Sequence, residues 1–278
     1  MRYSLLTRNV TIVIKKQGIW ELILYTVTCI KKEMVSIQNK VVVITGSNNG
    51  IGKALAQNFV KSGAVVYGLD IDTKNGAKLE NELGINFNYI ETDISKYDDV
   101  LYAQNIIKKK YGKVDILINN AAIQIIDDFI NIKVEDFKRV INVNLVGSFI
   151  CSKLLIEIME KSGVIINMLS IHSKKPRTNK LAYDISKAGI EMLTKEMALE
   201  LVPNNIHVLG VSFGACDTPM NKDWINDIQK RNETLNKIPL RRIASADEIA
   251  QFVVCIIENF SEYTTGNIFT IDGGRSLI

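Results

Sequence analysis

Tyr183 and Lys187 are the side chains of this sequence whose types and spacing suggest chemistry most directly. Residues at positions i and i+4 lie one above the other on a helix face. A free phenol, with a pKa of about 10, is a poor base at neutral pH, but a neighbouring ammonium group lowers such a pKa by roughly 1–3 units. The pair therefore predicts a general acid/base that exchanges a proton with an alcohol or carbonyl oxygen, although an exposed tyrosine beside a charge has the same spacing.

Two further polar residues lie where packing alone does not require them. Ser170 ends an apolar run, and we expect its hydroxyl to hold a substrate oxygen near Tyr183. Asn144 lies inside an otherwise apolar helical stretch, where an amide is poorly placed unless something uses it. The candidate catalytic residues are therefore Asn144, Ser170, Tyr183 and Lys187.

A glycine-rich segment, Thr45–Gly52, stands between an apolar run and a helical stretch. One glycine allows a sharp turn, a second lets the backbone approach a pyrophosphate, and a third lets the helix pack near the strand. The first N–H groups of such a helix point at bound phosphates. Because the segment links a strand to a helix, it predicts a dinucleotide site. The residues expected to contact the cofactor there are Gly46, Asn49, Gly50, Ile51 and Gly52.

Asp70 stands at the expected tip of the second strand, 18 residues after Gly52. A carboxylate there accepts hydrogen bonds from the ribose of the adenosine half and repels a 2′-phosphate. At ~4 Å and an effective dielectric constant of ~20, each unit of like charge costs on the order of 4 kcal/mol. Positions 47–49 and 71 supply no arginine or lysine to compensate, so NAD is favoured over NADP. The alternative is that Asp70, with Asp72 beside it, only makes a strand end soluble.

Short apolar runs alternate with helix-length segments from Lys40 onward. Residues 41–44 form a continuous β-branched run, as expected for a strand covered on both faces in a parallel sheet. In the next segment, Ile51, Leu55 and Phe59 make one apolar stripe of a helix. This alternation predicts an α/β fold of the Rossmann type, a doubly wound parallel sheet of about seven strands with helices on both faces. The strands are expected at 41–44, 65–69, 87–90, 114–118, 164–169, 206–211 and 267–271.

The candidate site residues and the motifs around them resemble those of the single-domain, NAD(P)-dependent short-chain dehydrogenases/reductases. The resemblance covers Lys40–Ile278, and its elements occur in the order expected for that family. Each element alone is weak, whereas the ordered set is highly specific. The matching elements are Thr45–Gly52, Asp93-Ile94, Asn119–Ala122, Asn144, Ser170, Tyr183 with Lys187, Gly214 with Thr218, and Asp272–Gly274.

The resemblance implies roles for the matching residues. Lys187 would bind the nicotinamide ribose, and Asn144 would hold a water molecule that links Lys187 to solvent. The remaining cofactor contacts would be Asp93 and Ile94 at the adenine, Asn120 and Ala121 along the cofactor, and Gly214, Cys216 and Thr218 at the carboxamide end.

Substrate selectivity in this family is carried mainly by the segment after Gly214, here residues 217–240. That segment is either a mobile amphipathic lid or a plain surface helix and loop. Residues 166–172 and 217–221 are similar to the sugar dehydrogenases of the family. The substrate would then contact Ser170, Tyr183 and His172.

An alternative is that His172 only caps a loop beside Lys174, Lys175 and Arg177. This basic cluster would instead favour an anionic or acyl-carrier substrate, as in the 3-oxoacyl reductases of the family. His207, which lies in an apolar strand, is expected to be structural.

Composition excludes several classes of protein. The 278 residues are 47% hydrophobic and 23% charged, unlike a disordered or collagen-like chain. Four widely spaced cysteines and two histidines predict no metal site, and the unclustered cysteines fit a reducing, cytoplasmic compartment. The net charge of +4 resides in residues 1–39, so the neutral remainder offers no electrostatic footprint for nucleic acid.

Residues 1–39 are interpreted as an extension, and residues 40–278 as one catalytic domain without a membrane segment. Ile19–Ile30 carries Glu21 and is shorter than the roughly 20 apolar residues that span a bilayer. No small-residue cleavage site follows it, whereas a secretory signal peptide ends at such a site. Three interpretations stay open: a weakly ordered extension, a membrane-surface or targeting segment, or translated upstream sequence with the working start at Met34.

The sequence thus predicts an NAD-dependent oxidoreductase acting on a small secondary alcohol or carbonyl, with a sugar or polyol favoured. A 3-oxoacyl reductase is the alternative, and a non-catalytic NAD-binding sensor or scaffold is the rival from another class. Retention of Ser170, Tyr183 and Lys187 argues against that rival. The resemblance also implies a homo-tetramer or dimer, because helices at 133–160 and 182–201 commonly pair between subunits.

Overall fold

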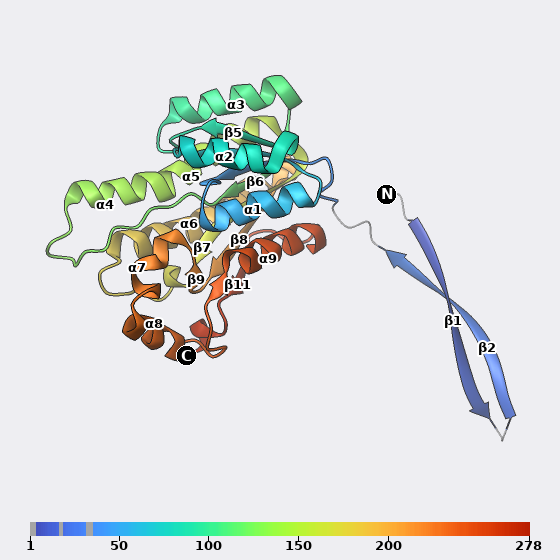
Figure 1. Ribbon diagram of the computed structural model, residues 1–278. Helices are drawn as coiled ribbons and strands as arrows, with labels where there is room; N and C mark the ends of the chain where they lie inside the picture. Colours follow the sequence, from blue (N-terminus) through green and yellow to red (C-terminus); the bar gives the residue numbers. More distant parts are fainter. Residues whose placement is uncertain (1–3, 17–18, 32–35) are drawn as a thin grey trace. The chain divides into compact units, whose positions relative to one another are not determined.

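The computed structural model describes residues 4–16, 19–31 and 36–278, and the chain divides into two compact units, residues 1–36 and 37–278. In the first unit, β1 (Ser4–Lys16) pairs antiparallel with β2 (Ile19–Lys31) over their whole length (Figure 1). The pattern of residues 1–39 gave no indication of these two strands. Met34, the alternative start, lies outside the described residues.

The second unit is built on a parallel seven-stranded sheet in the order β11-β8-β7-β6-β3-β4-β5. This confirms the predicted Rossmann-type sheet, and each expected strand is present. The strand β7 begins five residues earlier than expected, because a register irregularity lets Met159 pair with Val114 before the ladder resumes at Val164. The strands are β3 (Val41–Thr45), β4 (Val65–Asp70), β5 (Phe87–Glu91), β6 (Val114–Asn119), β7 (Met159–Ser170), β8 (His207–Phe213) and β11 (Ile268–Ile271).

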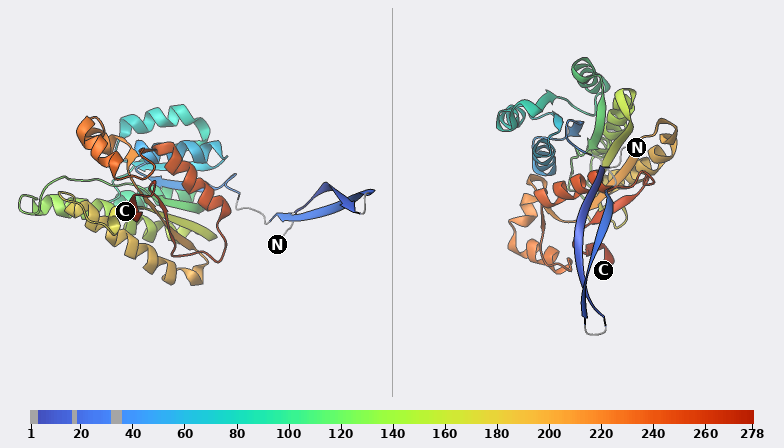
Figure 2. Two further views of the ribbon diagram at one scale, coloured as in Figure 1. Left: turned by 90° about the horizontal axis from the view of Figure 1, so that it is seen from below. Right: turned by 90° about the vertical axis from the view of Figure 1, so that its right-hand side faces the viewer.

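Helices cover both faces of this sheet (Figure 2). Side chains alternate along β3: Val42 and Ile44 pack toward one helical layer, and Val41 and Val43 pack toward the other. This double burial is the physical reason for the uninterrupted apolar run. The first layer holds α1 (Gly50–Lys61), α2 (Thr73–Leu83) and α9 (Ala246–Asn259); the second holds α3 (Tyr97–Tyr111), α5 (Gly147–Leu155) and α6 (Leu181–Glu200).

The order of the strands reverses at β3. The chain runs outward through β4 to β5 and then returns to β6 on the other side of β3. Connections that diverge in this way leave a crevice at the carboxyl ends of the strands, where ligands of such folds bind. The segments that carry the candidate residues leave the sheet at this edge.

The helix before β7 is interrupted. It runs through α4 (Val134–Ile141), a π-helical turn at Asn142–Val146, and α5, whose end is followed by a short 3-10 turn at Ile156–Ile158. Residues 134–158 are long and apolar enough to cross a membrane by length and composition alone, and core helices of soluble proteins pass the same test. Here α5 packs against α3 and α4 packs against α6.

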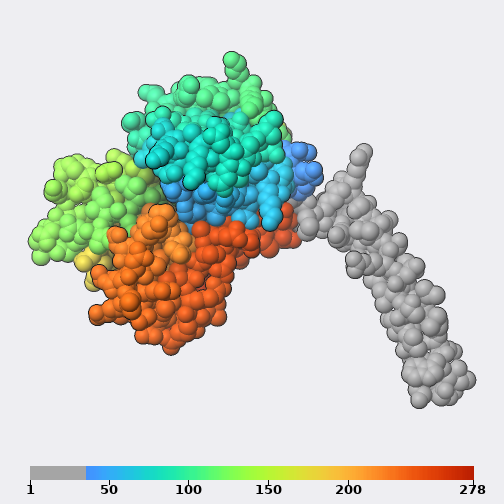
Figure 3. All heavy atoms as spheres, in the orientation of Figure 1, coloured from blue at the N-terminus to red at the C-terminus, as the bar shows by residue number. Residues whose placement is uncertain are grey.

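Residues 217–240 form two short helices rather than a single one. The segment contains α7 (Lys222–Ile225) and α8 (Ile228–Asn236), and a two-residue parallel ladder ties its ends, joining β9 (Cys216–Asp217) to β10 (Ala244–Ser245). Figure 3 shows it in orange as a lobe on the surface, below the blue and cyan residues of the body.

Candidate active site

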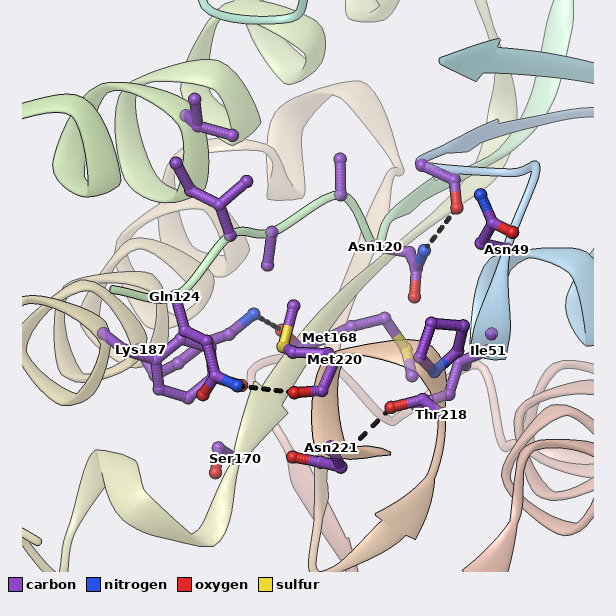
Figure 4. Close-up of a pocket in the computed structure, with 18 of the residues that line it drawn as sticks. Asn49, Ile51, Asn120, Gln124, Met168, Ser170, Lys187, Thr218, Met220 and Asn221 are labelled. Atoms are coloured by element: carbon purple, nitrogen blue, oxygen red, sulfur yellow. Dashed lines mark hydrogen bonds between the residues drawn. The ribbon is translucent and has the colours of Figure 1, made fainter. Parts of the chain in front are cut away.

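A cavity of about 730 Å³ opens at the carboxyl edge of the sheet. Strand ends supply its floor, and α6 and the segment 217–240 supply side walls. Figure 4 shows Asn49, Asn120 and Thr218 on one side of it, and Ser170 and Lys187 on the other. The structure brings together in this one cavity Gly46, Asn49, Gly50, Ile51, Asp70, Asp93, Ile94, Asn120, Ala121, Ser170, His172, Tyr183, Lys187, Gly214 and Thr218.

The glycine turn after β3 is locked to the end of β6. Gly46 has a φ of +63°, and a Cβ atom there would lie 2.8 Å from the Cα atom of Ala121. The side-chain amide of Asn120 donates to the carbonyl oxygens of Thr45 and Gly46, each at 3.0 Å. Only glycine can occupy this turn without displacing β6, so the backbone is left open toward the cavity.

Gly52 lies behind the cavity wall rather than in it. A Cβ atom at this position would lie 1.8 Å from the carbonyl oxygen of Gly46, well inside van der Waals contact. The missing side chain therefore lets α1 begin directly against the turn. This geometry aims the first turn of the helix, including Gly50 and Ile51, at the cavity.

The carboxylate of Asp70 is held in a fixed orientation at the tip of β4. One oxygen accepts from the backbone N–H of Asn48 and the other from that of Asp72, both at 3.0 Å. The side-chain amide of Asn48 in turn donates to the Asp72 carbonyl oxygen at 2.8 Å. The cations that line the cavity come from other segments, namely Arg139, Arg177, Lys180, Lys187 and Arg275.

Tyr183 and Lys187 lie one turn apart on α6, and both are nearly buried, with 7% and 2% of their surface exposed. The Lys187 Nζ atom lies 5.7 Å from the centroid of the Tyr183 ring and donates to the carbonyl oxygen of Met168 at 2.7 Å. The Ser170 hydroxyl, at the end of β7, accepts from the backbone N–H of His172 at 3.2 Å and lines the same cavity as Tyr183. A proton donor and a hydroxyl partner thus face the same space.

Burial sets the protonation of this pair. It raises the pKa of Tyr183 to about 12, against the opposing charge of Arg177, and it lowers the pKa of Lys187 to about 8. The expectation that the ammonium brings the phenol pKa below its usual value is wrong in this structure. The cause is that Lys187 donates to a backbone carbonyl while the phenol loses its contact with water.

Asn144 and Cys216 lie outside the cavity lining. Asn144 is fully buried in the π-helical turn; its side chain accepts from the N–H of Ile123 at 2.8 Å and donates to the Ser186 hydroxyl at 2.9 Å. It therefore ties the loop after β6 to α6. The Cys216 side chain packs in the hydrophobic core, and its neighbour Ala215 lines the cavity.

His172 caps its own loop and also lines the cavity. Its Nδ1 atom lies 2.8 Å from the carbonyl oxygen of Lys175. Burial lowers its pKa to about 4, so the ring is neutral at physiological pH. With Nδ1 donating to the carbonyl, Nε2 is left as a hydrogen-bond acceptor.

Several polar and charged lining residues were not anticipated from the sequence. Gln124, Lys180 and Arg275 line the cavity but belong to segments far apart in the chain. The amide of Gln124 joins two of the walls, because it accepts from Lys180 Nζ at 2.7 Å and donates to the Met220 carbonyl at 2.8 Å. Their types and spacing carry no local pattern by which they could have been found.

Residues 46–276 match the family model described as "Enoyl-(Acyl carrier protein) reductase". The chain is 33% identical over 243 residues to a 3-oxoacyl-[acyl-carrier-protein] reductase of Thermotoga maritima, covering 86% of this chain and 98% of that protein. It is 32% identical over 248 residues to 3beta-hydroxysteroid dehydrogenase 1 of Eggerthella lenta, covering 87% and 95%.

Two solved structures are similar over nearly the same range. A 3-ketoacyl-(acyl-carrier-protein) reductase from Brucella melitensis, complexed with NADH, superimposes with a TM-score of 0.79 at 31% identity, covering 87% of this chain and all of that one. The ligand-free aldohexose dehydrogenase of Thermoplasma acidophilum superimposes with a TM-score of 0.80 at 29% identity, covering 88% and 97%.

Proposed function

The chain belongs to the short-chain dehydrogenase/reductase family and is an oxidoreductase acting on alcohol or carbonyl groups, and on that premise we propose that it uses NAD and that its substrate is a small polyhydroxylated molecule. The observation that carries the proposal is the shared cavity, in which the glycine turn and the pair Tyr183 and Ser170 face one space. When bound, the nicotinamide ring supplies or accepts the hydride.

In this proposal the residues on each wall of the cavity bind a different part of the cofactor or substrate. The glycine turn and the first turn of α1 hold the pyrophosphate, and Asp70 accepts from the adenosine ribose. Tyr183 exchanges the proton with the substrate oxygen, Ser170 orients that oxygen, and Lys187 binds the nicotinamide ribose. Asn144 is then a positioning residue, because its hydrogen bonds fix the loop after β6 and α6 relative to each other.

A hydroxylated substrate is supported by the polar wall opposite the glycine turn. His172 offers an acceptor nitrogen and Gln124 an amide beside Tyr183 and Ser170, which suits a molecule with several hydroxyl groups. The aldohexose dehydrogenase among the similar structures agrees with this proposal. A second candidate is a 3-oxoacyl substrate, because two of the similar proteins carry that name.

We further propose a cytoplasmic homo-tetramer or dimer. Support comes from exposed apolar side chains on the helices that the sequence predicts to pair, Val146 and Phe149 before β7 and Ile185 and Met192 on α6. Exposed apolar groups of this kind mark association surfaces. Cys151 and Cys216 are buried free thiols, which accords with a reducing compartment.

The catalytic assignment is tested by Tyr183→Phe, which removes the proton-bearing oxygen and keeps the ring. We expect NAD to bind as it does to the native chain, while turnover falls by roughly 10²–10⁴. The measurement is absorbance of the reduced cofactor across sugars, polyols, steroids and 3-oxoacyl thioesters. Equal rates for the variant and the native chain would show that Tyr183 takes no part in the reaction and would favour the non-catalytic alternative.

The cofactor preference is tested by Asp70→Ala. Loss of the carboxylate removes the repulsion of a 2′-phosphate, about 4 kcal/mol per unit charge at ~4 Å, together with the acceptor for the ribose. We expect the ratio of kcat/KM for NAD to that for NADP to fall. Asp70→Asn keeps the shape and an acceptor oxygen, and separates charge from hydrogen bonding. A native chain that already prefers NADP contradicts the proposal.

A further inference from the structure

The substrate end of the cavity is lined by three cationic side chains, Arg177, Lys180 and Arg275. The guanidinium carbon of Arg177 lies 5.6 Å from the centroid of the Tyr183 ring. Burial, and then the charge of Arg177, lowers the pKa of Lys180 to about 8 and also lowers that of Arg275. The charge of Arg177 therefore acts on both of the other cations, and all three residues line the cavity that holds Tyr183; they are called the cationic recess below.

Within residues 36–278, only one member of the cationic recess has a carboxylate partner at ion-pair distance. Arg177 donates to Asp184 through Nη2 at 2.8 Å, and its own backbone N–H meets the second oxygen of Asp184 at 2.9 Å. The Nε atom of Arg177 is buried and has no hydrogen-bond partner among residues 36–278. Lys180 donates to Gln124, a neutral amide.

Arg275 is the member of the cationic recess whose positive charge is compensated least. The ion pairs found within the described part of the chain do not include it. The carboxylate whose charge acts on it, Asp272, accepts instead from the backbone N–H groups of Gly274 and Ser276 at 2.8 and 2.7 Å. A half-buried guanidinium thus faces the cavity with its donors available.

The other charged groups around the cationic recess do not compensate its excess of positive charge. Asp223 acts on Lys180 only through its charge, from an exposed position on α7. The neighbouring lysines of the linear basic cluster have partners of their own, because Lys174 pairs with Glu191 at 3.6 Å and Lys175 donates to the main-chain oxygen of Ile278. Among the residues of the second unit, none offers Lys180 or Arg275 a bonded carboxylate.

We propose that the cationic recess binds an oxyanion group, a carboxylate or a phosphate, of the substrate whose hydroxyl-bearing or carbonyl carbon faces Tyr183. Partly buried cations are costly unless an opposite charge meets them, and the planar fork of arginine matches a carboxylate or phosphate in bidentate fashion. The proposal rests on the proposed function and narrows its substrate class to polyhydroxylated acids or phosphate esters, with Arg275 as the main anchor.

The binding test needs no turnover. Trp224 lines the cavity and is one of two tryptophans, so Trp20→Phe makes it the single fluorescent reporter in the full chain. The NAD complex is titrated with gluconate, with inorganic phosphate and with sorbitol, a neutral polyol of the same carbon number as gluconate, at constant ionic strength. We expect at least one anion to saturate the signal at far lower concentration than sorbitol does.

Arg275→Gln is the decisive variant. We expect it to weaken binding of the preferred anion roughly 10- to 100-fold and to leave the affinity for sorbitol unchanged. Arg275→Lys should recover part of the affinity for the anion. The matched control is Lys222→Gln, which removes a positive charge from α7 outside the cavity lining. Tighter binding of gluconate identifies a carboxylate, and tighter binding of phosphate identifies a phosphate ester.

Two results would overturn the proposal: neither anion binding the native chain more tightly than sorbitol, or Arg275→Gln binding both anions as the native chain does. Failure of the proposed function has a different signature. In that case anion binding still depends on Arg275, but no polyhydroxylated acid or phosphate ester is turned over, and Tyr183→Phe changes nothing in the turnover assay.

Discussion

At the scale of single residues, functional side chains that lie close together in the sequence could be predicted. Side chains that only folding brings together could not. Tyr183 and Lys187 were found because one helical turn separates them. Lys180 and Arg275 meet in one cavity although they are 95 positions apart in the sequence, and each alone is an ordinary surface cation. The direction of the Tyr183 pKa shift was missed for a related reason, since burial of the phenol depends on segments distant in sequence.

The protonation of the catalytic pair predicts opposite pH profiles for the two directions of the reaction. Reduction needs the neutral phenol of Tyr183, present up to a pKa of about 12, and the ammonium of Lys187, lost above a pKa of about 8. With saturating cofactor, kcat/KM for reduction should be level below pH 8 and then fall up to tenfold per unit. Oxidation needs the phenolate and the same ammonium, so its kcat/KM should rise up to pH 8 and then level off.

Steady-state rates in both directions between pH 6 and 10 measure these profiles. The sign follows from the two groups: raising the pH creates phenolate, which favours oxidation, and removes the ammonium charge, which slows both directions. A reduction rate that increases with pH in this range contradicts the assignment of Tyr183 as proton donor.

At the scale of elements, the seven strands were predictable because double burial makes them apolar on both faces, as in Val41–Thr45. The start of β7 was not, because Glu160, Lys161 and Ser162 are exposed and resemble a loop. The π-helical turn that holds Asn144 was also missed, because it differs from an ordinary helix only in its backbone hydrogen bonds, such as the one from Gly147 N–H to the Asn142 carbonyl oxygen.

Gly52→Ala tests the contact between the glycine turn and α1. Alanine favours a helix by about 1 kcal/mol over glycine, but its Cβ atom would lie 1.8 Å from a backbone oxygen of Gly46, which has little freedom to move. We expect net destabilisation of about 1–3 kcal/mol or more and weaker NAD binding. Denaturant unfolding and a cofactor titration measure the two effects.

Gly189→Ala is the matched control. It lies in α6, and the Cβ atom would meet a methyl group at the end of the Leu145 side chain at 2.7 Å, which a rotamer change can relieve. We expect a much smaller loss of stability and unchanged NAD affinity. Similar behaviour of the two variants would show that the glycine turn tolerates displacement.

At the scale of the whole molecule, the catalytic fold is contained in the second unit. Its core clusters draw on residues from Ile37 onward, and the first turn of that unit is tied in by hydrogen bonds, such as the one from Asn39 N–H to the Gly63 carbonyl at 2.9 Å. Lys40 forms an ion pair with the buried Asp115 at 2.8 Å. The sequence set residues 1–39 apart from residues 40–278, but it gave no sign that β1 and β2 pair.

A chain that begins at Met34 tests whether the second unit is sufficient. We expect it to keep its thermal midpoint within about 2 °C and its rate of cofactor turnover, because Ile37, 1% exposed, remains in the core. Ile37→Ala in the same shortened chain should cost about 2–5 kcal/mol, which shows that the assay detects loss of contacts at this end. Thermal unfolding and turnover measure both chains side by side. Loss of turnover or of cooperative unfolding in the Met34 chain would show that residues 1–33 contribute to the catalytic unit.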